Sequence, residues 1–171
     1  MSSNKIVANF HKMKDEKSWN SLLEAAELKS AGIEEIRNVA NIYFNGFKGV
    51  DIAIERDLQK VEKFLRRSAA KGCSESIFDC AMLFEKDTKK KAIIFQKTKK
   101  NNKNSASLRG RSANALGNIY CNLKNYQKAL EEYKYAKAFN FDSSMSIYKV
   151  ALAIVHARNI ETSRIIQDVL E

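Results

Sequence analysis

Residues 112–140, SANALGNIYCNLKNYQKALEEYKYAKAFN, contain a complete pair of helices. Apolar and small residues recur at three- and four-residue steps, which places them on one face of each helix. The two stripes are Ala113, Leu116, Gly117 and Tyr120, then Ala129, Leu130, Tyr133 and Ala136. Asn125 lies between them and offers a side-chain oxygen that caps the second helix. The stretch therefore predicts two antiparallel helices joined by a tight turn.

Six of these residues carry a resemblance: Leu116, Gly117, Tyr120, Ala129, Tyr133 and Ala136. Their pattern resembles the tetratricopeptide repeat, in which small residues let two helices approach closely and an aromatic fills the gap between them. Phe141 stands where that family often has proline, and the chain has no proline. A repeat of this kind does not bury its apolar face alone, so the resemblance implies neighbouring helix pairs.

A second pattern occupies residues 33–72. It begins with an expected helix, 33–45, whose inward residues are Ile36, Val39, Ala40 and Tyr43. The residues that follow are Gly46, Gly49, Val50, Asp57, Lys60, Val61, Ala69, Ala70 and Gly72. This order is similar to the Sel-one-like repeat, although Val61 replaces the usual alanine and the loop is a few residues longer. The glycines suit a tight loop because glycine tolerates positive φ.

Further helices are expected at 18–31, 76–85, 88–98, 145–157 and 160–170, the last capped by Asn159. In helix 88–98, the residues expected to face inward are Ala92, Ile93 and Phe95. Residues 99–109 lack apolar periodicity and predict a long flexible connection. We therefore expect an all-α fold, a right-handed superhelix of about four antiparallel helix pairs. It forms one domain, 18–171, after a flexible segment, 1–17.

The net charge of +10 is concentrated in residues 86–111. The basic residues there are Lys86, Lys89, Lys90, Lys91, Lys97, Lys99, Lys100, Lys103, Arg109 and Arg111. Asp87 is the one acid, so ten positive charges against one negative give +9 and leave +1 for the rest of the chain. Three interpretations stay open: a solvated lysine face, a surface for an acidic protein, and a surface for nucleic acid or anionic membrane. Against nucleic acid, Phe95 is the one aromatic available for base stacking, and its position predicts burial.

In stacked helix pairs the first helix of each pair lines the inner surface. The predicted partner-binding groove consists of Arg37, Asn41, Asn45, Phe78, Met82, Arg111, Asn114, Asn118, Asn122 and Tyr148. In peptide-binding tetratricopeptide domains a cation and an asparagine hold a carboxylate-ended peptide, and the resemblance places Arg37 and Asn41 at that pair. Asp79 and Ala115 depart from the full clamp. The sequence therefore favours a polar, asparagine-rich groove, with exposed helix residues of no special role as the alternative.

Catalysis finds little support in the sequence. The two histidines, His11 and His156, form no metal-binding spacing, and no GK[ST] follows Gly49 as a phosphate loop requires. We expect no cofactor and no metal. The three cysteines, Cys73, Cys80 and Cys121, are expected to be reduced and buried, a Cys73–Cys80 bridge being the lesser alternative.

The expected location is cytoplasmic, since no apolar run approaches the roughly 18 to 20 residues that span a bilayer. The apolar core at Ile6 is also too short for a secretory signal. We expect a non-enzymatic adaptor, chaperone or inhibitor that binds a protein or peptide, an acidic one included, in its concave groove. The alternative is a basic protein that associates with RNA or anionic membrane through residues 86–111. The oligomeric state is left open.

Overall fold

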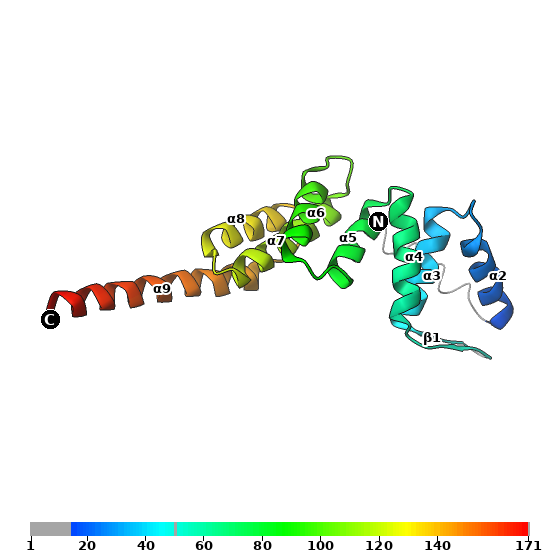
Figure 1. Ribbon diagram of the computed structural model, residues 1–171, viewed down its shortest axis with the longest axis horizontal. Helices are drawn as coiled ribbons and strands as arrows, with labels where there is room; N and C mark the ends of the chain where they lie inside the picture. Colours follow the sequence, from blue (N-terminus) through cyan, green and yellow to red (C-terminus); the bar gives the residue numbers. More distant parts are fainter. Residues whose placement is uncertain (1–14, 50, 171) are drawn as a thin grey trace. The chain divides into compact units, whose positions relative to one another are not determined.

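The computed structural model describes residues 15–49 and 51–170, with side chains as far as Arg158. This part of the chain is mostly α-helical, as expected (Figure 1). The helices are α2 (Glu16–Glu27), α3 (Ile33–Asn45), α4 (Leu58–Ala70), α5 (Ser74–Leu83), α6 (Thr88–Lys100), α7 (Ala106–Asn122), α8 (Tyr126–Ala138) and α9 (Ser144–Leu170). None of these helices, over its described residues, is long and apolar enough to cross a membrane.

Contacts within the chain divide it into two compact units, Met1–Phe84 and Glu85–Glu171. The division falls between α5 and α6, the two helices whose spacing predicts a pair. In the first unit α3 packs against α4, with α2 beside α3 and α5 beside α4. In the second unit α7 packs against both α6 and α8, and α8 packs against α9.

The core of the first unit is a cluster of aromatic and aliphatic side chains between α2, α3 and α4. Trp19 meets Tyr43 edge to face with ring centroids 5.3 Å apart, and Tyr43 stacks on Phe64 at 6.2 Å. Ile36 and Val39 are fully buried beside them. Ile36, Val39 and Tyr43 belong to the inward stripe predicted for helix 33–45, and the bounds of α3 match that prediction.

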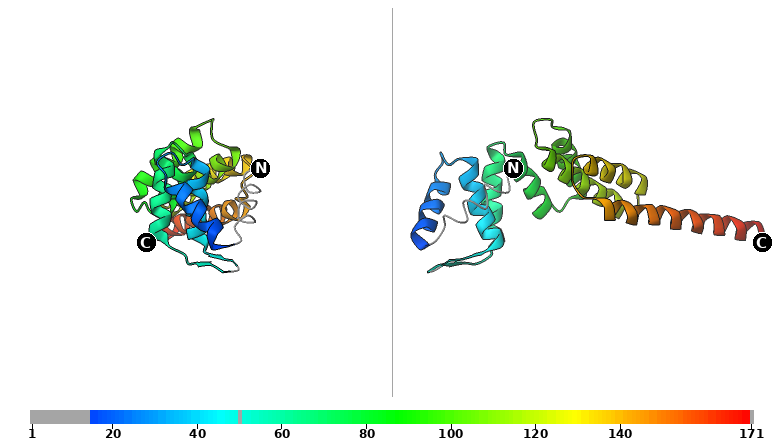
Figure 2. Two further views of the ribbon diagram at one scale, coloured as in Figure 1. Left: turned by 90° about the vertical axis from the view of Figure 1, so that its right-hand side faces the viewer. Right: turned by 180° about the vertical axis from the view of Figure 1, so that it is seen from behind.

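The loop after α3 contains a short antiparallel ribbon that periodicity did not predict. Strands β1 (Phe47–Lys48) and β2 (Ala53–Ile54) pair in register Phe47 with Ile54. Gly46 begins the ribbon at φ +71°, where a Cβ would also lie 3.1 Å from the Ile54 carbonyl oxygen. Figures 1 and 2 show the ribbon extending beyond the ends of α3 and α4. The additional loop residues relative to the Sel-one-like pattern thus form a hairpin.

The α7–α8 pair confirms the prediction made from residues 112–140. The two helices are joined by a three-residue turn, in which Lys124 has φ +57° and the Asn125 side chain accepts the Lys128 amide. Gly117 is buried, and a Cβ there would lie 2.5 Å from Cε1 of Tyr133. Glycine therefore permits a helix approach that any larger residue would prevent.

Two connections differ from the prediction. Residues 99–109 were expected to form a long flexible connection, but α6 continues to Lys100 and α7 begins at Ala106, so only 101–105 connect them. Asn104 donates from Nδ2 to the Thr98 carbonyl at 2.8 Å, and Ser105 caps α7 through the Leu108 amide. The prediction failed because asparagine and serine fold this turn by side-chain bonds to backbone rather than by apolar periodicity.

The second difference is at the C-terminal end. Separate helices were predicted at 145–157 and 160–170, but α9 is continuous over both ranges. The prediction that Asn159 caps a helix is therefore wrong, because residue 159 lies inside one. The helix also contains neither glycine nor proline to stop it. Most of the predicted flexible segment, 1–17, lies outside the described residues, but α2 already begins at Glu16.

Candidate functional site

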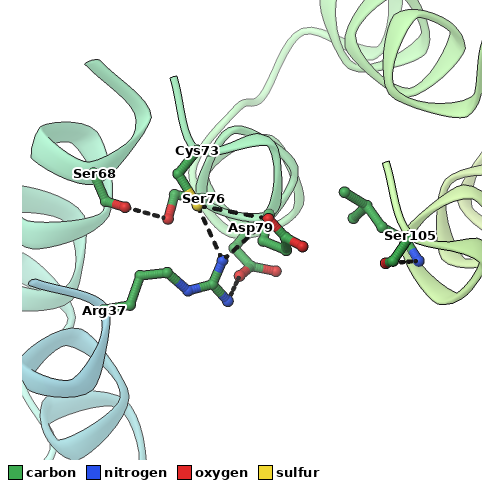
Figure 3. Close-up of polar contacts among 8 residues, drawn as sticks. Arg37, Ser68, Cys73, Ser76, Asp79 and Ser105 are labelled. Atoms are coloured by element: carbon green, nitrogen blue, oxygen red, sulfur yellow. Dashed lines mark hydrogen bonds and ion pairs between the residues drawn. The ribbon is translucent and has the colours of Figure 1, made fainter. Parts of the chain in front are cut away.

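A polar cluster joins α3 to the beginning of α5 in the first unit (Figure 3). Arg37 lies at its centre: one guanidinium nitrogen is 3.3 Å from Cys73 Sγ and the other is 3.6 Å from Asp79 Oδ2. Glu75 Oε2 lies 3.8 Å from Arg37 and accepts from the Cys73 thiol at 3.6 Å. Because two carboxylates face Arg37, its charge is balanced inside the unit rather than presented to a ligand.

Cys73 is buried in this cluster as the residue before α5. Burial raises the pKa of its thiol, but hydrogen bonds from Ser76, Arg37 and Ser68 lower the pKa by more, so the result is below the ordinary value. Burial raises the pKa of the Cys80 thiol, and no comparable set of donors opposes it. Cys73, Cys80 and Cys121 are all free thiols.

Five of the predicted groove residues lie in the first unit, and they differ in exposure. Asn41 is half-buried, and its carbonyl accepts the Asn45 side-chain amide at 2.9 Å. Met82 is exposed, as a groove residue would be. Phe78 is only 3% exposed, so its assignment as a surface for a partner is wrong. Its position on the α5 helix turns the large ring inward, where removal from water is favourable.

The other five predicted groove residues lie in the second unit, on α7 and the first turn of α9. Asn118 Oδ1 accepts the Tyr133 hydroxyl at 2.7 Å, and Asn114 Oδ1 accepts the Ser143 hydroxyl at 3.2 Å. These two asparagines therefore bind neighbouring helices within the unit. Asn122 and Tyr148 are exposed, and Arg111 is half-buried.

The basic segment separates into structural and exposed cations. Lys99 Nζ is 2.7 Å from both carboxylate oxygens of Glu132, and the two side chains are 12% and 13% exposed. Arg109 donates to the Lys99 carbonyl and to the Tyr135 hydroxyl, and its guanidinium lies 4.3 Å from the centre of the Phe139 ring. The sequence pattern placed Lys99 and Arg109 among the basic residues of a possible binding surface in 86–111. In the structure they instead hold α6, α7 and α8 together.

The remaining lysines of α6 are arranged around an exposed isoleucine. Four exposed lysines and Ile93 define what we name the α6 basic face: Lys89, Lys90, Ile93, Lys97 and Lys100. Lys89 and Lys97 lie four residues either side of Ile93 and so occupy neighbouring turns of the same face. None of the four lysines forms an ion pair with a described carboxylate. Lys103, in the connection, is exposed too, whereas Lys91 is half-buried.

The sequence pattern predicted the wrong side of α6 for Ile93. It predicted that Ile93 faces inward, but the side chain is 56% exposed, while Phe95 is buried at 1%. Ile93 lies on the lysine side of the helix, and Phe95 and Thr98 form the buried side against the rest of the unit. The spacing of the lysines at residues 89, 97 and 100 is the sequence signal that would have placed Ile93 among them.

The first unit has a surface depression of about 620 Å³, but the depression is not a candidate site comparable to the α6 basic face. Its lining comes from α2, α3, the ribbon and α4, and includes none of the predicted site residues. Asp57 caps α4 there, and Lys60 lies over the Tyr43 ring at 4.6 Å. Within the described part of the chain, no group of three or more histidine, cysteine, aspartate or glutamate residues is arranged to hold a metal ion. His156 is exposed on α9, and His11 lies outside the described residues.

Comparison of the chain with protein-family models, with curated proteins and with solved structures gives no match. The inference of function therefore depends on the surfaces described above.

Proposed function

We propose that the protein is a non-enzymatic interaction module that binds an acidic segment of a partner protein through the α6 basic face. The observation that carries this proposal is the exposed Ile93 among four exposed lysines that form no ion pair with a described carboxylate. Two residues of the predicted groove are already engaged inside the first unit, since Phe78 is buried and Arg37 is balanced by carboxylates.

The energies of the two kinds of contact suggest their separate roles. An exposed lysine–carboxylate pair contributes only about 0 to 1 kcal/mol, whereas burial of an isoleucine side chain contributes roughly 1.5 to 3 kcal/mol. Ile93 would therefore supply much of the affinity, and the lysines would steer an acidic partner and set its orientation. The complementary partner segment is acidic, with an apolar side chain facing Ile93.

The alternative, a protein that binds RNA or anionic membrane, uses the same lysines differently. A single-stranded nucleic acid gains roughly 1 to 3 kcal/mol for each base stacked on an aromatic ring. The one aromatic of α6, Phe95, is buried. Binding to a polyanion also does not require Ile93, so this residue distinguishes the two functions.

We further propose that the helix pairs belong to a solenoid of tetratricopeptide and Sel-one-like units. The close approach of Gly117 to Tyr133 and the cap at Asn125 support this for the α7–α8 pair.

Affinity capture from native cell lysate tests the function. The bait is the full chain, with nuclease-treated and untreated lysate, and with Ile93→Ala as a matched variant. We expect a discrete set of proteins that is still captured after nuclease treatment. The Ile93→Ala variant should bind these proteins at least about tenfold more weakly, because a loss of about 1.4 kcal/mol of binding free energy is a tenfold loss of affinity. Material lost on nuclease treatment, or capture that Ile93→Ala leaves unchanged, would contradict the proposal.

A further inference from the structure

Helix α9 is apolar on two faces over its described residues, and only one of them is packed. Ile147, Val150 and Ile154 contact the core that α7 and α8 form around Tyr133. A second stripe is exposed and consists of Met145, Tyr148, Leu152 and Val155. At about 100° per residue, the centres of the two stripes lie roughly 150° apart on the helix. A helix that is apolar all round is normally buried, so the exposed stripe requires a partner.

The exposed stripe has the spacing of a coiled-coil seam. Met145 and Leu152 are seven residues apart, and Tyr148 and Val155 follow each by three, which assigns them to heptad positions a and d. The sequence continues the same register at Asn159, Thr162, Ile166 and Val169. The 27 residues of α9, about 40 Å of helix, hold more than three heptads without interruption.

The burial of individual residues agrees with this register. Every described residue at positions a, d, e and g is exposed: Ser144, Met145, Tyr148, Lys149, Ala151, Leu152, Val155, His156 and Arg158. The buried and half-buried residues are all at b, c and f: Ser146, Ile147, Val150, Ala153 and Ile154. The rest of the second unit thus packs on the outer side of α9 and leaves the seam open.

We propose that the seam is covered by α9 of a second copy of this chain, in a parallel, in-register, two-stranded coiled coil. A parallel pair sets position g of one helix beside the following e of the other. In this chain those pairs are Ser144 with Lys149, Ala151 with His156, Arg158 with Ser163 and Ile165 with Leu170, and none brings two like charges together. An antiparallel pair centred on the seam would instead place Arg158 of one chain opposite Arg158 of the other, which would bring two positive charges together.

Two further features of the seam fit a dimer of this kind. A single polar residue at an a position, here Asn159, fixes the register of two parallel chains. Burial of an apolar side chain removes roughly 60 to 120 Å² from water, so the six apolar seam residues from each copy would bury on the order of 700 to 1,400 Å². The upper part of that range reaches the size of a stable protein–protein interface.

Sedimentation equilibrium of the full chain tests the proposal. We expect a dimer whose dissociation constant increases at least about a hundredfold on Leu152→Glu, because two carboxylates would face each other in the seam. The matched control is Leu123→Glu, an exposed leucine in the α7–α8 turn, which should leave the dimer intact. Circular dichroism confirms that both variants are folded.

Tyr148→Cys tests the orientation without adding a charge. In a parallel pair residue 148 faces its own copy, so mild oxidation should give a covalent dimer that the wild type does not form. In an antiparallel pair the two copies of residue 148 would lie roughly 27 Å apart, about 18 residues along the helix. A monomeric wild type, a dimer unaffected by Leu152→Glu, or the absence of crosslinking through residue 148 would overturn the proposal.

Discussion

Tyr133 lies against Gly117 so closely that a Cβ atom on residue 117 would be 2.5 Å from Cε1 of the tyrosine ring. The hydroxyl of the same tyrosine donates a hydrogen bond to Oδ1 of Asn118, the residue after Gly117, at 2.7 Å. A tyrosine hydroxyl is protonated at neutral pH at its ordinary pKa, and burial raises the pKa of Tyr133 further, so the hydroxyl is available as the donor. One aromatic side chain thus sets the distance between α7 and α8 and also bonds across it.

Gly117→Ala is expected to destabilise the protein, although alanine is the better helix former by about 1 kcal/mol. The added methyl group must displace the Tyr133 ring, and overpacking of this kind costs about 1 to 3 kcal/mol. Chemical denaturation measures the difference. The control is Ser107→Ala, an exposed site in the same helix, which should be neutral or stabilising. A stabilised Gly117→Ala variant would show that the helices do not approach as described.

Lys99→Ala is expected to lower the free energy of unfolding by roughly 2 to 3 kcal/mol. The substitution leaves the nearly buried Glu132 carboxylate without its partner, and fully buried pairs lose about 3 to 5 kcal/mol when one member is removed. Lys97→Ala, on the exposed side of the same helix, should change the unfolding free energy by less than about 0.5 kcal/mol. Equal effects of the two substitutions on thermal unfolding would refute the structural role of Lys99.

Arg37→Ala is expected to raise the pKa of the Cys73 thiol, because it removes one of the hydrogen bonds that lower this pKa. The pH dependence of the Cys73 ¹³Cβ chemical shift reports the change. The free energy of unfolding should decrease by roughly 1 to 2 kcal/mol, since both of the partner carboxylates are partly exposed. Arg66→Ala, which removes an exposed ion pair to Glu62, is the control and should leave the Cys73 pKa unchanged.

Asp57 is expected to make the protein sensitive to acid. Its carboxylate accepts the Lys60 and Gln59 amides at the beginning of α4, and the Lys60 bond is the main cause of its lowered pKa. The pKa of the Asp57 carboxyl is lower in the folded protein than in the unfolded chain. Its ionised form therefore stabilises the fold at every pH above the unfolded pKa, which is near about 4. This contribution is lost as the pH falls through the folded pKa.

Asp57→Asn keeps an acceptor oxygen but does not titrate, so its melting temperature should fall less between about pH 5 and about pH 2 than that of the wild type. The comparison is Glu55→Gln, an exposed carboxyl between the ribbon and α4, which should follow the wild type. If Asp57→Asn and the wild type lost stability in parallel, the cap would not be the acid-sensitive group.

Much of the second unit was predictable from local sequence. The α7–α8 pair was predicted because its stripes have a regular spacing and Asn125 signals the turn. The connection 101–105 was not, since Asn104 and Ser105 act through side-chain bonds to backbone that leave no periodic trace. Asn159 was misread as a cap because asparagine, although favoured at caps, also occurs inside helices, as it does in α9.

The candidate site was less predictable than the fold. A helical pattern indicates that residues share a face, but not whether that face is paired inside the protein. Arg37, Lys99 and Arg109 each have a cation suited to binding a partner, and each is occupied by an internal acceptor. Ile93 could not be recognised from hydrophobicity alone, because its exposure depends on which side of α6 faces α7.

The most direct test of the proposed function compares two variants with the same net charge. Lys89→Glu/Lys97→Glu/Lys100→Glu reverses the α6 basic face, and Lys124→Glu/Lys134→Glu/Lys137→Glu reverses three exposed lysines of α8 and the turn before it. Both variants change the net charge by six, so a nonspecific electrostatic effect should change protein capture by the two variants equally. Each is used as bait in nuclease-treated lysate after its melting temperature is confirmed. The account predicts loss of the captured proteins only with the α6 variant, and equal capture by the two variants would contradict it.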